Sequence, residues 1–231
     1  FFTVDIIPSP LRNGEGIAGL APWLGDLLWY QALPGISTTL VLTQIALVGT
    51  GIVALLTFPL ISRLFVDRFC QVPGHGLLII GRSVPEYLLA YILLQLWGPS
   101  MLPAVVALVI HNGAIIGHLI GRQSSTLKLR PDVVSGFNCY TYEAVPRLYR
   151  SFLSFLLYRW EIIMRETAIL GILGITTLGF YVDSAIQELR FDRAIVLIFI
   201  TALLNIGVDS LARTIRWQLR LRTTPATLEL G

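Results

Sequence analysis

Four charged side chains lie inside one long apolar stretch of the sequence, where they could bind or guide a small ion. Arg159, Glu161, Arg165 and Glu166 fall within Leu157–Gly179, which is long enough to cross a membrane. A charge at the centre of a spanning helix costs about 2.5–3.5 kcal/mol, so it usually faces a partner or an aqueous path. Guanidinium groups beside a hydrated path would favour a small anion. The alternative interpretation is that these charges hold helices together.

Helical geometry divides the four charges into two sets. At 100° per residue, Glu161 and Arg165 lie about 40° apart and can form an ion pair. Arg159 and Glu166 lie within about 20° of each other, on nearly the opposite face. They are about 10.5 Å apart along the axis, which is too far for a direct pair. These two residues therefore need partners on other helices or in an aqueous cavity.

A second charged group lies in the apolar segment over 77–97. Arg82 and Glu86 are four residues apart, so in one continuous helix they would share a face. Pro85 lies between them and loosens the local hydrogen-bond ladder, because it has no backbone N–H. Two interpretations stay open: a self-neutralised ion pair at a helix interface, or a pair that faces a pore at a kink.

The other polar residues in apolar segments predict packing rather than chemistry. His111 and His118 lie seven residues apart on one face, and Asn112 is next to the first of them. Two histidines without nearby carboxylates are a weak metal signal, so we expect them to be satisfied by packing and expect no metal site. Asn205 and Asp209 are likewise expected to bond neighbouring helices.

The sequence lacks the motifs that would predict catalysis. It has no Walker-type phosphate loop, no Ser-His-Asp arrangement and no His-Glu-x-x-His motif. We therefore expect no catalytic residues and no cofactor in this chain. A transporter built from it would take its energy from a partner or from an ion gradient.

Composition predicts an integral membrane protein. The 231 residues are 55% hydrophobic and only 13% charged, with a mean hydropathy of +0.73. Spans of roughly 20 apolar residues are predicted at about 36–65, 77–97, 102–120, 151–172 and 194–211. The segment Leu20–Tyr30 is too short to span and carries Trp23, Trp29 and Tyr30, so it is predicted to be an interfacial helix.

The distribution of basic residues predicts the orientation. Eleven of the 17 lie in the loops after the first and third spans and in the C-terminal tail, against three on the other side. By the positive-inside rule, the loop over 122–150 and the C-terminus are cytoplasmic, and the start of the chain lies outside. An outside start followed by five spans also predicts a further span upstream of Phe1.

Three glycines follow the charged span, at Gly171, Gly174 and Gly179. Glycines this close together let backbones approach or let a helix break. A broken helix beside buried charges is typical of segments that line a transport path. We predict a hinge at these glycines, followed by a short helix over 181–189.

Two short segments of the sequence carry a family resemblance. They are YRWE at 158–161, followed by Arg165 and AILG at 168–171, and GRSVPE at 81–86. The first is similar to the YR(W/F)E…R…LG pattern and the second to the RSxPE segment of the phosphonate-type permeases of ABC importers, a group that includes phosphite and hypophosphite permeases. The similarity runs from about Thr38 to Arg220. The later glycine-rich pattern is altered, because ITTL at 175–178 replaces several small residues.

The resemblance implies a type I ABC-importer permease in the bacterial inner membrane. A second permease subunit, identical or a sister, would complete the path. Two cytoplasmic ATPases would bind ATP and Mg, and a periplasmic binding protein would deliver the anion. Such permeases dock their ATPase through an EAAxxxG loop, which falls here in 122–150. Gly136 and the Val-Pro ending at Pro146 fit that pattern, whereas Glu-Ala-Ala is replaced by Arg-Pro-Asp at 130–132. The docking candidates are Arg130, Asp132, Gly136, Glu143 and Pro146.

The predicted fold is an all-α integral membrane permease core of about five transmembrane helices with an N-terminal interfacial helix. Residues 1–35 form a periplasmic segment, 36–220 the permease domain and 221–231 a cytoplasmic tail. The predicted function is import of phosphonate, phosphite or hypophosphite. The candidate path or gate residues are Arg82, Glu86, Arg159, Glu161, Arg165 and Glu166.

Two other classes stay open. An ion-coupled secondary transporter would use the buried carboxylates as proton sites and would have no ATPase. A membrane scaffold subunit would have no path of its own, and it would show no uptake defect separable from loss of assembly.

Overall fold

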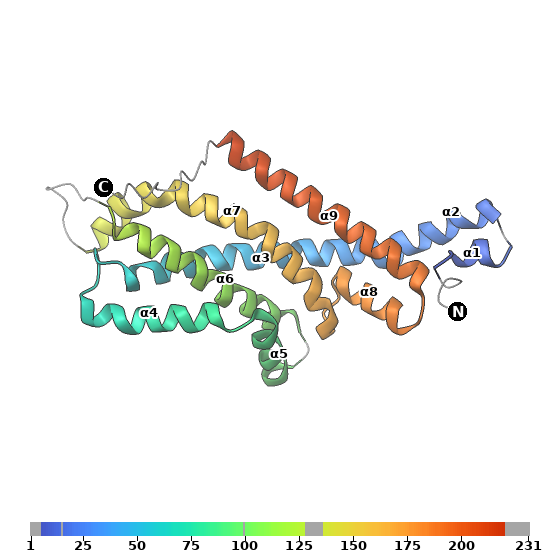
Figure 1. Ribbon diagram of the computed structural model, residues 1–231, viewed down its shortest axis with the longest axis horizontal. Helices are drawn as coiled ribbons and strands as arrows, with labels where there is room; N and C mark the ends of the chain where they lie inside the picture. The colour runs from blue at the N-terminus through green and yellow to red at the C-terminus, as the bar shows by residue number, and fades with distance from the viewer. Residues whose placement is uncertain (1–5, 15, 99, 128–135, 220–231) are drawn as a thin grey trace, which may run out of the picture.

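The computed structural model describes residues 6–14, 16–98, 100–127 and 136–219, and the elements in these ranges are helical. Figure 1 shows an elongated bundle in which α3, α6 and α7 run along the long axis. The α-helices are α1 (Ser9–Arg12), α2 (Gly16–Leu27), α3 (Leu33–Thr57), α4 (Arg68–Ser83), α5 (Glu86–Trp97), α6 (Met101–Ser124), α7 (Val145–Ile169), α8 (Leu178–Gln187) and α9 (Phe191–Gln218).

Three helical runs are long and apolar enough to cross a membrane, and the number reaches five if each of two bent pairs is one span. The single runs are Gly16–Ile61, α6 and α9. The bent pairs are Gln71–Ser83 with Glu86–Trp97, at 89°, and Cys139–Leu173 with Leu178–Gln187, at 40°. The chain is therefore a multi-pass membrane protein, and the short helix predicted after the fourth span is present as α8.

The first span is longer than the sequence predicted. A π-helical turn over Leu28–Ala32 joins α2 to α3, and the helical run Gly16–Ile61 has 46 residues. The predicted interfacial helix over 20–30 is thus helical but continuous with the span that follows it. Figure 1 shows α2 extending past the rest of the bundle at the end where α1 lies.

The second span is broken into α4 and α5, and the expected shared face of Arg82 and Glu86 is wrong. Val84 and Pro85 are both extended, with ψ angles of 121° and 134°, so the helix ends at Ser83 and restarts at Glu86. Proline disfavours helical geometry in the residue before it, which explains why the break falls here. Arg82 therefore ends one helix and Glu86 begins the next.

The helix α6 is the centre of the bundle, and a stripe of glycines brings it against α3. Gly113, Gly117 and Gly121 recur every four residues, and a Cβ at these positions would meet Val53, Thr57 and Ile61. Small residues at this spacing allow close helix packing in membranes, where no hydrophobic effect drives helices together. The close packing fixes the polar residues of α6 in the interior.

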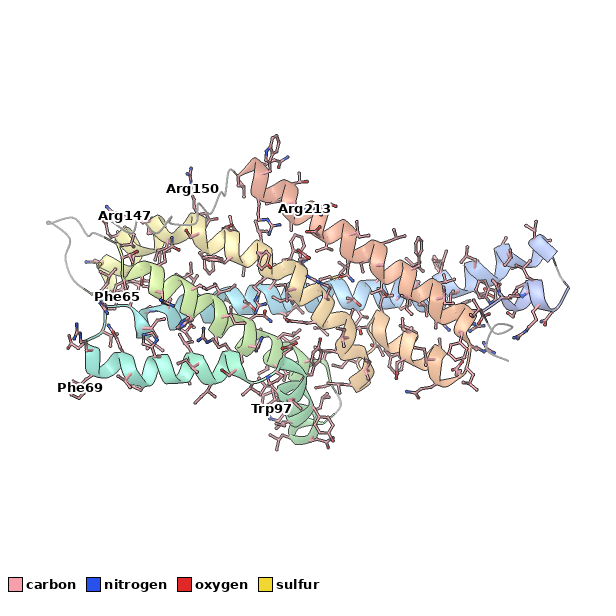
Figure 2. The ribbon with its side chains drawn as sticks, viewed as in Figure 1. Phe65, Phe69, Trp97, Arg147, Arg150 and Arg213 are labelled. Carbon is pink, nitrogen blue, oxygen red and sulfur yellow. The ribbon has the colours of Figure 1, made fainter. Side chains whose placement is uncertain are left out.

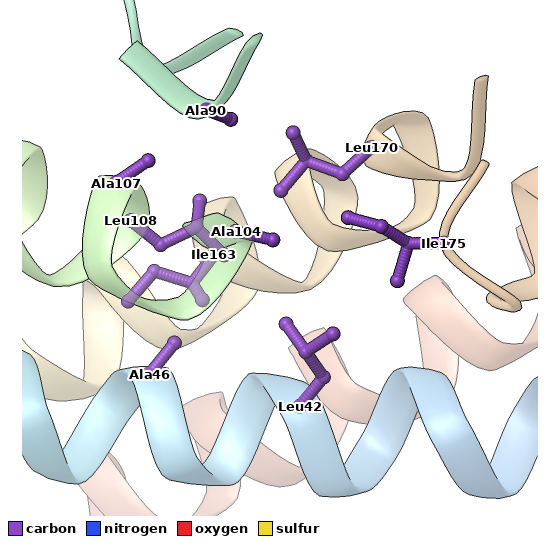
Figure 3. Packing of buried hydrophobic residues seen from close by; sticks show 9 residues of the cluster. All are labelled: Leu42, Ala46, Ala90, Ala104, Ala107, Leu108, Ile163, Leu170 and Ile175. Carbon is purple, nitrogen blue, oxygen red and sulfur yellow. The ribbon is translucent and has the colours of Figure 1, made fainter. Parts of the chain in front are cut away.

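The main apolar cluster lies next to those polar residues. Figure 3 shows its side chains converging from α3, α5, α6 and the end of α7, with Leu42, Leu108 and Ile163 among them. Leu108 and Ile163 are fully buried. Because Leu108 precedes Asn112 by one helical turn, the same packing that forms this cluster also positions Asn112.

Candidate functional site

The two faces of α7 differ as the helical geometry predicted. Arg165 Nη2 lies 2.9 Å from Glu161 Oε1, and this pair is on the outer face, with 56% and 25% of the two side chains exposed. On the other face, Glu166 is buried and Arg159 is partly buried. The predicted pairing of Glu161 with Arg165 is therefore confirmed, and Arg159 and Glu166 point to the interior.

Glu166 is held by an asparagine from α6. Asn112 is fully buried, and its Nδ2 donates to Glu166 Oε2 at 3.0 Å and to the Leu108 carbonyl at 3.0 Å. The sequence predicted only packing for Asn112. Its position in the middle of an apolar span, where an amide needs a partner, was the signal that could have identified it.

Arg159 contributes a cation to the same region. Its Nε is buried without a hydrogen-bond partner, and the carboxylates of Glu166 and Glu86 act on it electrostatically. Glu86 belongs to the first turn of α5, where the positive end of the helix dipole favours a carboxylate. Three helices thus bring together what we call the central polar cluster: Glu86, His111, Asn112, Arg159 and Glu166.

His111 closes the break between α4 and α5. Its Nδ1 lies 3.0 Å from the Val84 carbonyl, so Nδ1 carries the hydrogen and donates it. Its Nε2 lies 3.5 Å from Glu86 Oε2. This contact is attractive only when either Nε2 or the carboxylate carries a proton. His111 therefore connects the backbone at the break with the carboxylate that follows it.

The charge balance of the central polar cluster is acidic. By formal charge, the carboxylates of Glu86 and Glu166 outnumber the one guanidinium of Arg159. In the part of the chain that the structure describes, no three His, Cys, Asp or Glu side chains are placed to hold a metal ion. The cluster therefore connects three helices, and Arg82 is exposed in the last turn of α4.

Replacing Asn112 with alanine is expected to destabilise the protein by about 1–3 kcal/mol, because the buried Glu166 carboxylate would lose its donor. Thermal unfolding of the detergent-purified protein measures this effect. The matched control is Gln187→Ala, which removes the 2.6 Å bond from Gln187 Nε2 to Asp183 Oδ2 on the exposed surface and should change little. Equal midpoints for the two variants would contradict the assigned role of Asn112.

The predicted hinge glycines lie at a real break in the chain but are not alike. Gly174 has a φ of +88° and ends the 3₁₀ turn Leu170–Leu173, a conformation that favours glycine. Gly171 and Gly179 are packed against backbone atoms, where a Cβ on Gly179 would collide with the Ala168 carbonyl. Gly171 and Gly179 thus fix the joint between α7 and α8, and Gly174 forms the turn in the segment between these helices.

The segment before α7 is anchored to α3. Tyr140 donates from its hydroxyl to the Leu55 carbonyl at 3.1 Å, and its ring stacks on Phe58 with centroids 5.4 Å apart. Of the predicted docking residues, Gly136 is exposed with a φ of +95°, and Pro146 lies in the first turn of α7. Arg130 and Asp132 lie outside the described residues.

Glu143, also predicted for docking, is turned inward. It is buried, and its Oε1 lies 2.6 Å from Arg147 Nη2. The exposed groups here are aromatic, namely Phe137, Tyr142 and Tyr149, which are 55–79% exposed. Figure 2 shows Arg147 and Arg150 at the same end of the bundle as Phe65 and Phe69. Sequence analysis missed these aromatics, although large apolar side chains in a basic loop are the usual signal of a binding surface.

The fold is that of a type I ABC-importer permease. The structure resembles a chain described as "Crystal structure of an amino acid ABC transporter with histidines", with a TM-score of 0.68 and 15% identity. The match covers 87% of this chain and 97% of that one. No profile of a known protein family matches the chain.

Sequence comparison gives two relatives, both named as permeases. The chain is 23% identical over 227 residues to the phosphate-import permease protein PhnE of Mycolicibacterium smegmatis. It is 23% identical over 142 residues to the phosphite transport system permease protein PtxC of Stutzerimonas stutzeri. These matches cover 93% and 58% of this chain but 42% and 51% of the relatives, so the chain spans about half their length. Permeases are transport components rather than enzymes, in agreement with the sequence resemblance.

Proposed function

We propose that the chain is the permease subunit of an ATP-driven importer for a small phosphorus oxyanion such as phosphonate, phosphite or hypophosphite. The observation that carries the proposal is the central polar cluster, which joins α5, α6 and α7 inside a permease fold. Buried charges that link several spans mark functional regions of membrane proteins. The names of the two relatives support the choice of a phosphorus oxyanion.

A second permease subunit would cover the charged outer face of α7 and α9. Glu161 pairs with Arg165 there, and Asp209 pairs with Arg213 one turn along α9. Only 17% of the apolar part of α9 is buried within the chain. Because charged pairs are costly against lipid, this face should meet a partner subunit or a hydrated path between the two.

One of the two cytoplasmic ATPases would dock on the exposed aromatic and arginine side chains beside η3 (Cys139–Ala144). Tyr140 would pass the movement of that ATPase to α3, since it connects this segment with the Leu55 carbonyl. With this end in the cytoplasm of a bacterial cell, the end that carries α1, α2 and α8 would meet a periplasmic binding protein. ATP and Mg in the partner would then switch the permease pair between inward-facing and outward-facing states.

Affinity purification of the tagged chain from its host tests the proposal. We expect an ATPase to copurify in stoichiometric amount, and ATP hydrolysis by the complex to increase when the loaded binding protein is added. Uptake driven by a proton gradient with no ATPase present would instead favour a secondary carrier, with Glu86 and Glu166 as proton sites. A complex whose uptake defects always follow loss of assembly would favour a scaffold.

A further inference from the structure

A second polar cluster lies between α4 and α6, apart from the central one. His75 and Arg82 are seven residues apart on one face of α4, and His118 and Arg122 are one turn apart on α6. The two helices pack against each other, as Figure 1 shows. The rings of His75 and His118 meet edge to face, with centroids 5.7 Å apart. We call these four residues the basic groove.

The basic groove combines two arginines with two histidines. Within the described ranges, the charged groups that act on the His118 ring are Arg82, His75 and Arg122, and all three are basic. The central polar cluster has the opposite balance, with two carboxylates around Arg159. Like charges placed together at low dielectric repel each other strongly, so the groove favours a negatively charged ligand.

One polar atom in the groove lacks the partner that it needs. His118 is only 7% exposed, and its Nδ1 is buried without a hydrogen-bond partner. Buried polar atoms are nearly always bonded, because leaving one unpaired is costly. An acceptor oxygen from a ligand in the groove would satisfy Nδ1 when that nitrogen carries the ring hydrogen. The neighbouring arginines cannot do so, because a guanidinium only donates.

We propose that the basic groove binds a tetrahedral phosphorus oxyanion, with His75, Arg82 and His118 as its donors and Arg122 at the far end. The inference deepens the proposed function and rests on it for the identity of the transported anion. Guanidinium groups are strong donors to phosphorus oxyanions because they offer a planar pair of N–H groups, and an imidazole donates from the ring nitrogen that carries its hydrogen. The anion in transit and the headgroup of a phospholipid share this chemistry.

The groove and the central polar cluster then have different tasks. Along α6, His118 lies seven residues beyond His111, about 10.5 Å farther toward the loop over 122–150. An anion that passes the break between α4 and α5 would leave an acidic region and enter a basic one. The central polar cluster therefore gates the path, and the basic groove holds the anion after the gate.

Binding of phosphite to the purified complex, in detergent free of phospholipid, tests the proposal through ³¹P NMR line broadening. The test variant is His75→Gln/His118→Gln, which keeps polar side chains but removes both imidazoles. We expect it to weaken phosphite binding about tenfold or more, as loss of a charge-assisted bond does. The control Arg190→Gln removes a basic group at the α8–α9 turn, 3.8 Å from Glu188, and should leave binding unchanged. The single variant His118→Gln replaces the double one if the latter does not assemble.

The outcomes separate the sources of the ligand and the two proposals. Phosphite binding that requires the histidines supports the anion in transit. Histidine-dependent binding of added phosphatidylglycerol, without binding of phosphite, supports a lipid headgroup. Binding that is unchanged in both histidine variants overturns the groove. If the wild-type complex binds phosphite through the histidines but imports none, the proposed function fails and the groove stands. If both histidine variants import phosphite with unchanged KM, the groove fails and the proposed function stands.

Discussion

Replacing Arg159 with methionine is expected to abolish uptake of the phosphorus oxyanion and to destabilise the protein by about 3 kcal/mol. Arg159 is the cation that faces Glu86 and Glu166 in the central polar cluster. Removing one partner of a buried charged set leaves the others uncompensated, which is the costly part of the change. Uptake by intact cells and thermal unfolding of the purified protein measure the two effects.

A companion variant separates the structural effect from the transport effect. In Arg159→Met/Glu166→Gln, one buried carboxylate is removed together with the cation, and the new glutamine amide still has an oxygen that can accept from Asn112. We expect this variant to recover most of the stability but not the uptake. Normal uptake by Arg159→Met would exclude a role for Arg159 in the gate. Recovery of uptake along with stability in the double variant would reduce that role to packing.

Replacing Gly179 with alanine is expected to destabilise the protein by about 3 kcal/mol or more, at the upper end of the cost of overpacking. A Cβ there would collide with the Ala168 carbonyl, which is backbone at the end of α7 and cannot rotate away as a side chain would. Gly171 packs against the Phe180 N–H on the other side of the same joint. The variant should show a much lower yield of folded protein and a lower unfolding midpoint in fluorescence-detected size exclusion.

Gly76→Ala is the matched control for Gly179→Ala. Gly76 is also helical, and a Cβ there would have no neighbour within 4 Å. Alanine favours a helix by about 1 kcal/mol over glycine, so the control should be as stable as the wild type or slightly more stable. If both variants unfold at the same temperature, Gly179 does not hold a packed joint.

Sequence patterns could predict the spans and the two faces of α7, because both depend on local periodicity. The pairing of Glu161 with Arg165 needs only one helical turn, and the structure shows it at 2.9 Å. The break at Pro85 was partly foreseeable, since proline disturbs a helix. The angle of 89° between α4 and α5 was not foreseeable, because it depends on the packing of α5 against α6.

The partners of the interior residues could not be predicted from periodicity. Asn112 and Glu166 are 54 residues apart, and His75 and His118 come from different helices. A helical repeat shows which residues share a face but not which helix that face meets. The glycine stripe on α6 determines that this face of α6 meets α3, because Gly117 lets Thr57 approach closely. That stripe is visible in the sequence, and it was the signal that could have identified α6 as the central helix.

ATP-dependent uptake by the copurified complex, reconstituted in proteoliposomes with its binding protein, tests the central claim most directly. We predict that radiolabelled phosphite or phosphonate accumulates only when ATP and Mg are supplied to the ATPase side. This accumulation should be lost in the complex that carries Arg159→Met/Glu166→Gln. Accumulation without ATP that follows an imposed proton gradient, or undiminished ATP-dependent accumulation in the variant complex, would contradict the proposed permease and its gate.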